Sequence, residues 1–496
     1  MFAKNTFWNL VYQLTAVVAG FLIPKAIIGV YGSEVNGLVT SLTQFIGYFA
    51  LVEAGVSGAA TFALYKPLAQ GDWKGVNIVA SASRAFYLKS GVVFLVLLVG
   101  LSVIYPIFVS AGTLSLWEIA TLTFLLGAKV VVDFFSLSKY RVFLTADKKN
   151  WLIQLASTVY TLLNTAIIIV SSHLRVPVVV VYALALAAVF ARSAILAVYT
   201  RRRYSEFDCK VDYGDFKLPQ RWDALFLQIL GAVQSGAPVI LATVLCGNMS
   251  EVSVLAVYLL ISNGLQMIPN VLGMGLQASF GRQIANGDYE ALRASYRPYR
   301  ALVYSVSAVA CGCAFSLILP FIDLYAGGFR DADYHNALLG FLVVLNVFLY
   351  HGKSSQGLLV IAAGMYHETR WQTCIQALII VVLGVPLTMG FGIVGTITAS
   401  CLSNAYRVVD LLLFEPIRIS GDTVSNSFSA FGLYALQTAL IAMPGYLFSG
   451  LACNWVIWIA VAAVLVLWGV AVVCVTLALL DKDGFRSIFK SFVRDR

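Results

Sequence analysis

The chain has 496 residues, of which 60% are apolar and only 11% are charged, and its mean hydropathy is +0.86. Soluble proteins carry about 25% charged residues, so this composition excludes a soluble globular protein, a disordered chain and a disulfide-rich secreted scaffold. It indicates an integral membrane protein made of helices. The formal net charge of +9 therefore bears first on membrane topology and not on a nucleic-acid partner.

Hydropathy predicts fourteen membrane-spanning helices. The first apolar stretch, near 7–28, is longer than the core of a signal peptide and no small-residue cleavage site follows it, so it is predicted to be a membrane helix. A bilayer core takes about 20 apolar residues per helix. On this measure the spans lie near 7–29, 37–63, 87–109, 117–139, 151–171, 178–200, 223–245, 252–278, 299–320, 337–361, 371–390, 392–414, 431–449 and 454–480.

Lys and Arg residues are distributed unevenly over the predicted loops. Of the 33 in the chain, 27 fall on one side of the predicted membrane, 3 on the other side and 3 inside spans. Because cytoplasmic loops carry the positive excess, this bias places both termini in the cytoplasm. The longest predicted external loop, 321–336, has only sixteen residues. It argues against a membrane glycan polymerase or ligase, since such enzymes need a large external loop for their chemistry.

The sequence contains no motif for catalysis, a cofactor or a metal. The eight cysteines include no CxxC pair, and most lie in apolar runs, as is typical of small buried apolar residues. The four histidines are scattered, and HExxH, GxSxG and P-loop patterns are absent. We therefore expect a protein that is not an enzyme and that holds neither a cofactor nor a metal ion.

Two short sequence echoes indicate an internal repeat. The segment AQGDW at 69–73, after the second span, matches ANGDY at 285–289, after the eighth. A weaker echo links 145–151, after the fourth span, with 362–371, after the tenth. Six spans per unit is an even number, so the two halves run parallel, which is one of the standard transporter layouts. The predicted parts are an N-lobe over 1–200, a basic cytoplasmic linker over 201–222, a C-lobe over 223–416, and two further spans with a cytoplasmic tail over 417–496.

Ionisable residues inside the spans are the main functional candidates. Each costs on the order of 3 kcal/mol near mid-membrane and persists where it faces a partner or a cavity. Lys129 and Asp133 are four residues apart, and Arg407 and Asp410 are three apart, so each couple is either a self-neutralising pair or part of a functional site. Arg192 either snorkels to the cytoplasmic surface or lies in the interior.

Two further candidates have no obvious partner in sequence. Glu53 has no cation within four residues and lies among small residues that allow close packing or a break in the helix, so it is either functional or bonded to another helix. The run YHGKSSQ at 350–356, which includes His351 and Lys353, is polar or small throughout and is predicted to line a hydrated cavity. Intramembrane cations exceed anions, which favours an anionic cargo such as a phosphate or pyrophosphate.

Three segments of the first 90 residues resemble a known family. PKAIIGVYG at 24–32, EAGVS at 53–57, and YKPLA at 65–69 followed by Gly71-Asp72 are similar to the polysaccharide flippases, the O-antigen and capsule repeat-unit exporters of the multidrug/oligosaccharidyl-lipid/polysaccharide exporter superfamily. The resemblance implies two six-helix lobes around a cationic cavity in the bacterial cytoplasmic membrane. It also implies an undecaprenyl-pyrophosphate-linked oligosaccharide as cargo, moved to the outer leaflet by alternating access, with polysaccharide assembly machinery and membrane lipids as partners.

Two related branches of the superfamily fit less well. Lipid II flippases share an acidic-Gly motif that would map to Glu53 and Gly55, but the arginine pair that precedes it there is missing from 43–49. Drug exporters often carry an acid in the first span, and 7–29 contains none. A multidrug or cation antiporter and a lipid II flippase remain the alternative functions, followed by the glycan polymerase or ligase.

The expected site combines cations along the path with acids that gate or couple transport. The predicted gating or coupling acids are Glu53, Asp133 and Asp410, with membrane potential, protons and sodium all possible drivers. The predicted path for the pyrophosphate and sugar is lined by Lys25, Arg84, Lys129, Arg282, His351, Lys353 and Arg407.

Overall fold

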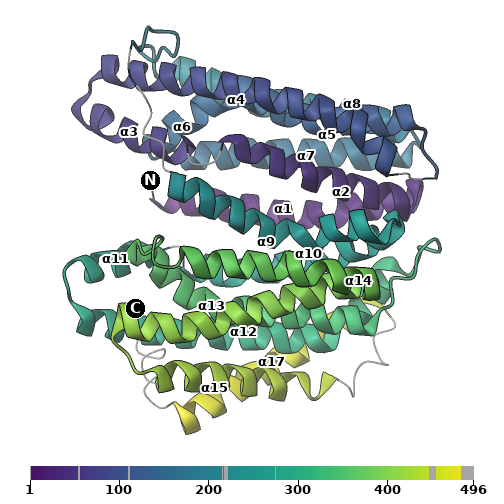
Figure 1. The fold of residues 1–496 in the computed structure, drawn as a ribbon, viewed down its shortest axis with the longest axis vertical. Coiled ribbons are helices and arrows are strands. Elements are labelled where there is room, and N and C mark those ends of the chain that lie inside the picture. The colour runs from purple at the N-terminus through teal and green to yellow at the C-terminus, as the bar shows by residue number, and fades with distance from the viewer. Residues whose placement is uncertain are drawn as a thin grey trace. The chain divides into compact units, whose positions relative to one another are not determined.

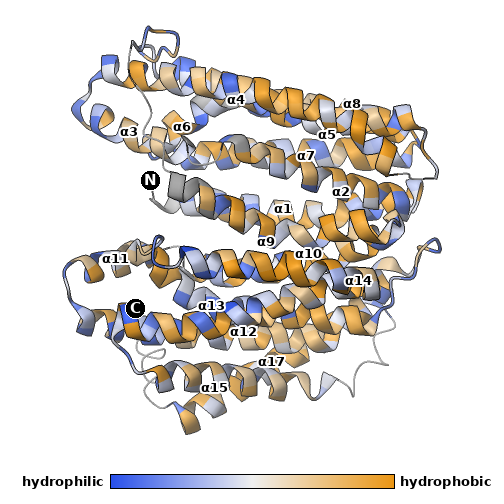
Figure 2. Cartoon of the chain, in the orientation of Figure 1, coloured by the Kyte–Doolittle hydropathy of each residue, from blue (hydrophilic) through white to orange (hydrophobic). Residues whose placement is uncertain are grey.

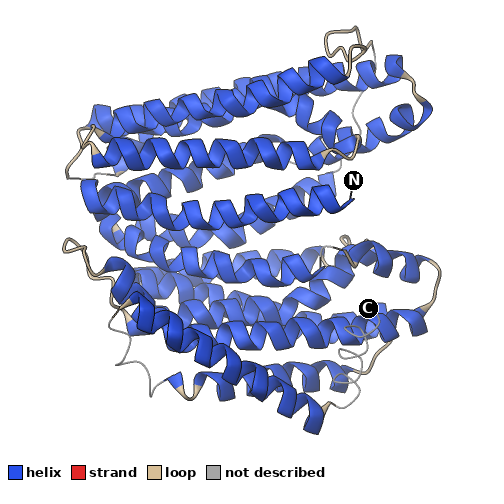
Figure 3. Cartoon of the chain, turned by 180° about the vertical axis from the view of Figure 1, so that it is seen from behind, coloured by secondary structure: helices blue, strands red, loops and turns tan. Residues whose placement is uncertain are grey.

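The computed structural model describes residues 2–53, 56–109, 112–214, 216, 222–273, 275–445 and 454–481. Every regular element in these ranges is a helix, as Figure 3 shows. The helices divide into two compact units. The first unit comprises Met1–Ala232 with Gly247–Ser253, and the second comprises Val233–Cys246 with Val254–Arg496.

The first unit contains the elements up to the predicted linker, and helices α9 and α10 are shared between the units. Its interior is filled by apolar side chains from several helices, among them Leu42, Phe94, Leu98 and Leu122, which are fully buried. The elements are α1 (Phe2–Tyr31), α2 (Ser33–Phe49), η1 (Ala50–Glu53), α3 (Val56–Gln70), α4 (Trp73–Phe108), α5 (Leu116–Val132), η2 (Asp133–Leu137), α6 (Ser138–Ala146), α7 (Asn150–His173) and α8 (Val178–Arg203) (Figure 1).

The second unit continues to the C-terminal helices. Its core includes an aromatic stack in which the Tyr434 ring lies 5.0 Å from that of Tyr304 and 4.5 Å from that of Phe348. The elements are α9 (Trp222–Cys246), α10 (Met249–Gly273), α11 (Gln277–Ala285), α12 (Tyr289–Ala326), α13 (Ala337–Ala363), α14 (Arg370–Glu415), η3 (Pro416–Ser420), α15 (Val424–Ala442) and α17 (Trp455–Leu480).

The prediction of about fourteen spans is confirmed, although several bounds move. Eleven helices in the described residues are long and apolar enough to cross a membrane, and Figure 2 colours much of their length as hydrophobic. One of them, 370–420, contains two predicted spans, because the backbone at Gly392 leaves the helical region (φ 57°, ψ −139°). In the second predicted span α2 ends at Phe49, the short helix η1 follows over Ala50–Glu53 and α3 begins at Val56, while α15 supplies the thirteenth span.

The first sequence echo corresponds to two matching turns. Gly71 and Gly287 both adopt the left-handed conformation, with φ of 69° and 70°, which glycine enters at little cost. The aspartate after each caps a long helix, because Asp72 accepts a hydrogen bond from the Gly75 N–H and Asp288 accepts one from the Ala291 N–H, both at 3.0 Å. Each turn therefore joins a short helix, α3 or α11, to a long one, α4 or α12, in its own unit.

Candidate functional site

Lys129 lines a cavity inside the first unit. The cavity has a volume of about 200 Å³, and its walls come from α1, α2, α5, α7 and α8. Its polar lining consists of Lys129, Thr43, Tyr160, Asn164 and Tyr182. Within the described part of the chain, the half-buried Lys129 ammonium has neither an ion pair nor a hydrogen bond. An uncompensated cation thus faces a small, mainly apolar cavity that a few polar side chains border.

Asp133 pairs with Arg192, so the predicted alternative of a Lys129–Asp133 pair is wrong. Asp133 begins the π-helical turn η2, and its backbone N–H still bonds to the Lys129 carbonyl, so the two residues keep the regular helical spacing without forming an ion pair. The Arg192 guanidinium reaches it from α8 and also lies over the Tyr160 ring, 4.8 Å from the centroid. The interpretation of Arg192 as snorkelling to the surface is therefore corrected as well.

Glu53 has a distant partner that sequence spacing could not reveal. Its carboxylate lies 2.8 Å from the Arg141 guanidinium, which α6 supplies 88 residues further along the chain. Glu53 ends the short 3-10 helix η1, which follows α2 and departs from regular α-helical geometry, while its small neighbours at 54 and 55 lie outside the described residues. It is thus one half of a partly exposed ion pair and not a lone acid.

In the second unit, Lys353 lies beside a different ion pair. Arg407 and Asp410 are on α14, 2.5 Å apart, in the three-residue spacing seen in the sequence. Lys353, half-buried on α13, is close enough to Arg407 for the two charges to repel. The Lys353 ammonium lies 5.5 Å from the centre of the Tyr350 ring, and none of the described carboxylates pairs with it.

His351 packs between helices in this structure, and its predicted place in a transport path stays a prediction. Its side chain is completely buried; Nε2 lies 3.0 Å from the Leu265 carbonyl oxygen and Nδ1 lies 3.7 Å from the Cys311 sulfur. Ser355 and Gln356 are also fully buried, and Gln356 donates a hydrogen bond to the Tyr304 hydroxyl. Most of the run 350–356 therefore packs against other helices, which corrects its interpretation as the lining of a hydrated cavity.

The other predicted cations are spread over three helices. Lys25 is exposed on α1, Arg84 is half-buried on α4, and Arg282 is exposed on α11. They line neither the Lys129 cavity nor the larger cavity of the second unit. Their place in a transport path stays a prediction.

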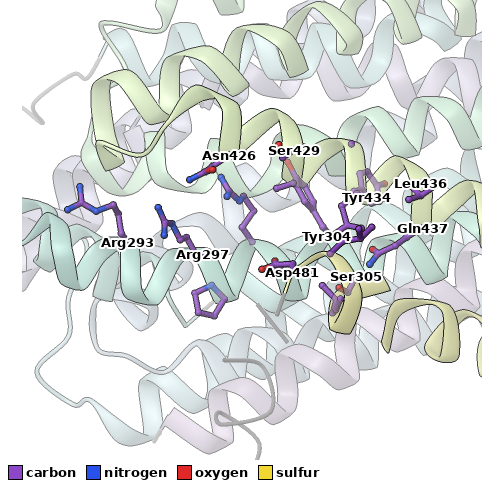
Figure 4. A pocket seen from close by; sticks show the side chains of 18 of the residues that line it. Arg293, Arg297, Tyr304, Ser305, Asn426, Ser429, Tyr434, Leu436, Gln437 and Asp481 are labelled. Atoms are coloured by element: carbon purple, nitrogen blue, oxygen red, sulfur yellow. The ribbon is translucent and has the colours of Figure 1, made fainter. Parts of the chain in front are cut away.

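Sequence reasoning missed a large cavity in the second unit, shown in Figure 4. It has a volume of about 960 Å³ and lies between α12, α15 and α17. Arg293, Arg297 and Arg300 line its polar end, and in the sequence they fit the positive excess of a predicted cytoplasmic segment. The sequence feature that could have revealed this arginine cluster is its spacing of four and three residues, which places the three side chains on one face of a helix.

Asp422 fixes the arginines at that end. Arg297 donates two hydrogen bonds to its carboxylate, at 2.7 and 3.2 Å, and the buried Arg300 donates one to the Ser427 hydroxyl at 3.1 Å. Burial alone would raise the pKa of the Asp422 carboxyl, but hydrogen bonds from Arg297, Asn426 and the Thr423 backbone lower it to about 2. The Arg297–Asp422 pair therefore stays charged at physiological pH.

The two units share an arrangement of charge. Lys129 and Lys353 lie on the fourth and tenth predicted spans, and Arg192 and Arg407 on the sixth and twelfth, which correspond in the repeat. In each unit the arginine is neutralised by an aspartate while the lysine has no such partner among the described residues. Within the same residues, no three His, Cys, Asp or Glu side chains gather as a possible metal site.

Comparison with solved structures identifies the fold. The chain is similar to an inward-facing multidrug resistance MATE family transporter of the MOP superfamily, with a TM-score of 0.65 and 16% identity over 85% of this chain and 99% of that one. It is similar to the lipid II flippase MurJ in an inward closed conformation, with a TM-score of 0.66 and 11% identity over 97% and 99%. An outward-facing MATE transporter gives a TM-score of 0.59 and 16% identity over 86% and 96%.

These identities establish a shared fold and nothing finer. None of the protein-family models matches the sequence, and a search of curated proteins gives no match. The chain is thus a multi-pass membrane protein with the fold of MOP-superfamily transporters.

Proposed function

We propose that the protein is a flippase that moves an undecaprenyl-pyrophosphate-linked oligosaccharide from the inner to the outer leaflet of the bacterial cytoplasmic membrane, by alternating access, for cell-surface polysaccharide synthesis. The observation that carries the proposal is the pair of lysines without carboxylate partners, Lys129 and Lys353, at corresponding places in the two units. The shared fold with transporters and a lipid flippase supports it.

Two uncompensated ammonium groups suit a diphosphate cargo that must also be released. A lysine in a membrane span is costly unless a counter-charge is present for part of the cycle. Lysine contacts phosphate as a compact point charge, without the bidentate geometry of arginine. The arginines of the same regions, Arg192 and Arg407, are already bonded to aspartates and so offer less to an incoming anion.

The acids favour this cargo over a cationic drug. Glu53, Asp133 and Asp410 each pair with an arginine, so none offers a cation an uncompensated carboxylate. We retain them as gating or coupling groups, since an ion pair can open when a cargo phosphate competes for its arginine. The short segment between α12 and α13, 327–336, gives a polymerase or ligase little room for its chemistry.

A complementation assay tests the proposal. Lys129→Ala and Lys353→Ala should each reduce surface glycan in a deletion strain, the double variant should abolish it, and lipid-linked repeat units should accumulate on the inner leaflet. Lys74→Ala, at an exposed lysine in the first turn of α4, is the matched control and should complement fully. Membrane levels of each variant are measured in parallel. Full complementation by the double variant would refute the proposal, and normal glycan with altered drug resistance in the deletion strain would favour the antiporter.

A further inference from the structure

Glu415 is a buried acid that the proposed transport path does not use. It is the last residue of α14, its side chain is completely buried, and the π-helical turn η3 follows it from Pro416. Both carboxylate oxygens are enclosed, and no group in the described part of the chain makes a hydrogen bond to either of them. A carboxylate buried without such partners is costly while it is charged, so it usually persists in a protein as the neutral acid.

Two serine hydroxyls lie next to this acid. The hydroxyls of Ser420 and Ser427 are close enough to interact with Glu415, although neither is in hydrogen-bonding geometry with it. The Ser420 oxygen accepts a hydrogen bond from the Asp422 N–H at 3.2 Å. The Ser427 oxygen accepts one from the Arg300 guanidinium at 3.1 Å. These bonds leave each hydroxyl hydrogen available, so both serines can turn a donor toward an ionised Glu415.

Two charged side chains lie within electrostatic range of Glu415, one of each sign. Asp422 repels a negative charge on Glu415, and Arg297 already neutralises Asp422 at 2.7 Å. Arg300 is buried and lies 3.9 Å from Asp422, so its charge can offset a second carboxylate. The bond from Arg300 to Ser427 joins α12 to α15, and a turn of the guanidinium toward Glu415 would break it.

The other elements packed around η3 add no closer charge in the described residues. From α12, the buried and uncharged Tyr296 hydroxyl also lies within electrostatic range of Glu415. On α13, His351 is bonded to a backbone carbonyl and Lys353 lies beside the arginine of the α14 ion pair. On η3 itself, Arg418 is exposed. The charge state of Glu415 therefore depends mainly on the two charged groups named above.

We propose that Glu415 is a proton-binding site, which holds a proton in this arrangement and draws Arg300 away from Ser427 when the proton leaves. The neutral acid leaves Arg300 bonded to α15, so α15 stays packed against α12. The ionised acid competes for the guanidinium and frees the first turn of α15, which borders the large cavity. The proton passes to solvent, and a rise in pH loosens this wall. The inference concerns the second unit alone and holds whichever cargo the protein carries.

Infrared spectroscopy of the full-length protein in detergent tests for the proton. Near neutral pH the wild type should show the carbonyl stretching band of a protonated carboxylic acid, and Glu415→Gln should lack that band. Glu368→Gln, at an exposed acid between α13 and α14, is the matched control and should keep it. A spectrum that is the same in Glu415→Gln and the wild type would refute the proton site. If Glu415→Gln does not fold, wild type made with isotope-labelled glutamate replaces it, and a band that does not shift has the same meaning.

Two variants test the role of Arg300. The pH at which the band is half lost measures the proton affinity of Glu415. Arg300→Gln removes the counter-charge of the ionised acid and should raise this affinity about tenfold, the effect of one charge-assisted hydrogen bond. Ser427→Ala removes the competing acceptor and should lower the affinity. Midpoints equal to that of the wild type in both variants would contradict the transfer of Arg300.

Hydrogen exchange tests the loosening of α15. Exchange at 424–427, measured relative to α14 in the same sample, should increase in the wild type as the infrared band disappears with rising pH. In Glu415→Gln the relative exchange should stay low, because the amide cannot ionise and leaves Arg300 on Ser427. Relative exchange that is independent of pH in the wild type, or that rises equally in Glu415→Gln, would overturn the link between the proton and α15.

Discussion

The two units carry the same intramembrane charges in different geometries. In the first unit the ion pair joins two elements, because Asp133 lies in η2 and Arg192 in α8. In the second unit Arg407 and Asp410 lie on the same helix, α14. The second pair is the more deeply buried: its side chains are 9% and 17% exposed, against 20% and 31% in the first.

This comparison separates two contributions to stability. A pair between elements holds the tertiary structure together, while a pair within one helix mainly neutralises charge. Removing one partner of a buried pair costs about 3–5 kcal/mol, because the other charge is left in a poorly solvated place, whereas an exposed pair contributes about 0–1 kcal/mol. In the second unit, Asp410 also offsets Arg407 where Lys353 repels it. We therefore expect the burial of an ion pair to affect the free energy of unfolding more than whether the pair links two elements.

The largest effect is expected for Asp410→Asn. This change leaves Arg407 and Lys353 without the carboxylate that offsets them, and it should lower the free energy of unfolding by about 3 kcal/mol. Adding Lys353→Ala should restore part of that loss by removing the repulsion. Thermal unfolding in detergent measures both. A smaller loss than that of Asp133→Asn would show that linking elements outweighs burial.

Asp133→Asn should cost less, about 1–2 kcal/mol, because this pair is more exposed. Its partner is identified by rescue: Arg192→Gln in the same chain should recover part of the loss, and Lys129→Ala should recover none. The melting temperatures of Asp133→Asn and of the two double variants show which residue is the partner of Asp133. Rescue by Lys129→Ala in place of Arg192→Gln would restore the pairing suggested by the four-residue spacing.

The matching turns predict matching costs. Gly71→Ala and Gly287→Ala each force a side chain into the left-handed region and should each lower the free energy of unfolding by about 1 kcal/mol. Gly357→Ala, inside α13 with open space around the new methyl group, is the control and should be neutral or slightly stabilising. The two turns would not be structurally equivalent if the difference between the two losses of unfolding free energy were larger than the smaller loss.

Lys129→Ala should have the smallest effect on stability, below about 0.5 kcal/mol. The lysine has no described partner to leave behind, and the change removes a desolvated charge. Chemical unfolding in detergent is the measurement. A loss comparable with that of Asp133→Asn would mean that Lys129 is a structural residue.

Much of the fold could be predicted from the sequence, because a membrane span has a simple physical signature. The apolar length of each span, the bias of Lys and Arg, and the turns at Gly71 and Gly287 all follow from local rules. The break after α2 and the join of two spans in α14 were less accessible, since helix ends depend on packing. Gly392 nevertheless marks the kink within α14.

The site was predicted less well because partners across helices leave no trace in local spacing. Glu53 and Arg141 are 88 residues apart, and Asp133 and Arg192 are 59 residues apart on different elements. His351 and Gln356 looked hydrated because they are polar, but neighbouring helices supply their hydrogen bonds. The sequence did not predict a cavity at Arg293, Arg297 and Arg300, because the excess of Lys and Arg on the cytoplasmic side already accounts for arginines at these positions.

The most direct test of the central claim is the binding of undecaprenyl pyrophosphate to purified protein. Each of Lys129 and Lys353 is expected to contribute about tenfold to affinity as a charge-assisted contact, so Lys129→Ala with Lys353→Ala should weaken binding about a hundredfold, while Lys74→Ala binds as the wild type does. Undiminished binding by a correctly folded double variant would contradict the account.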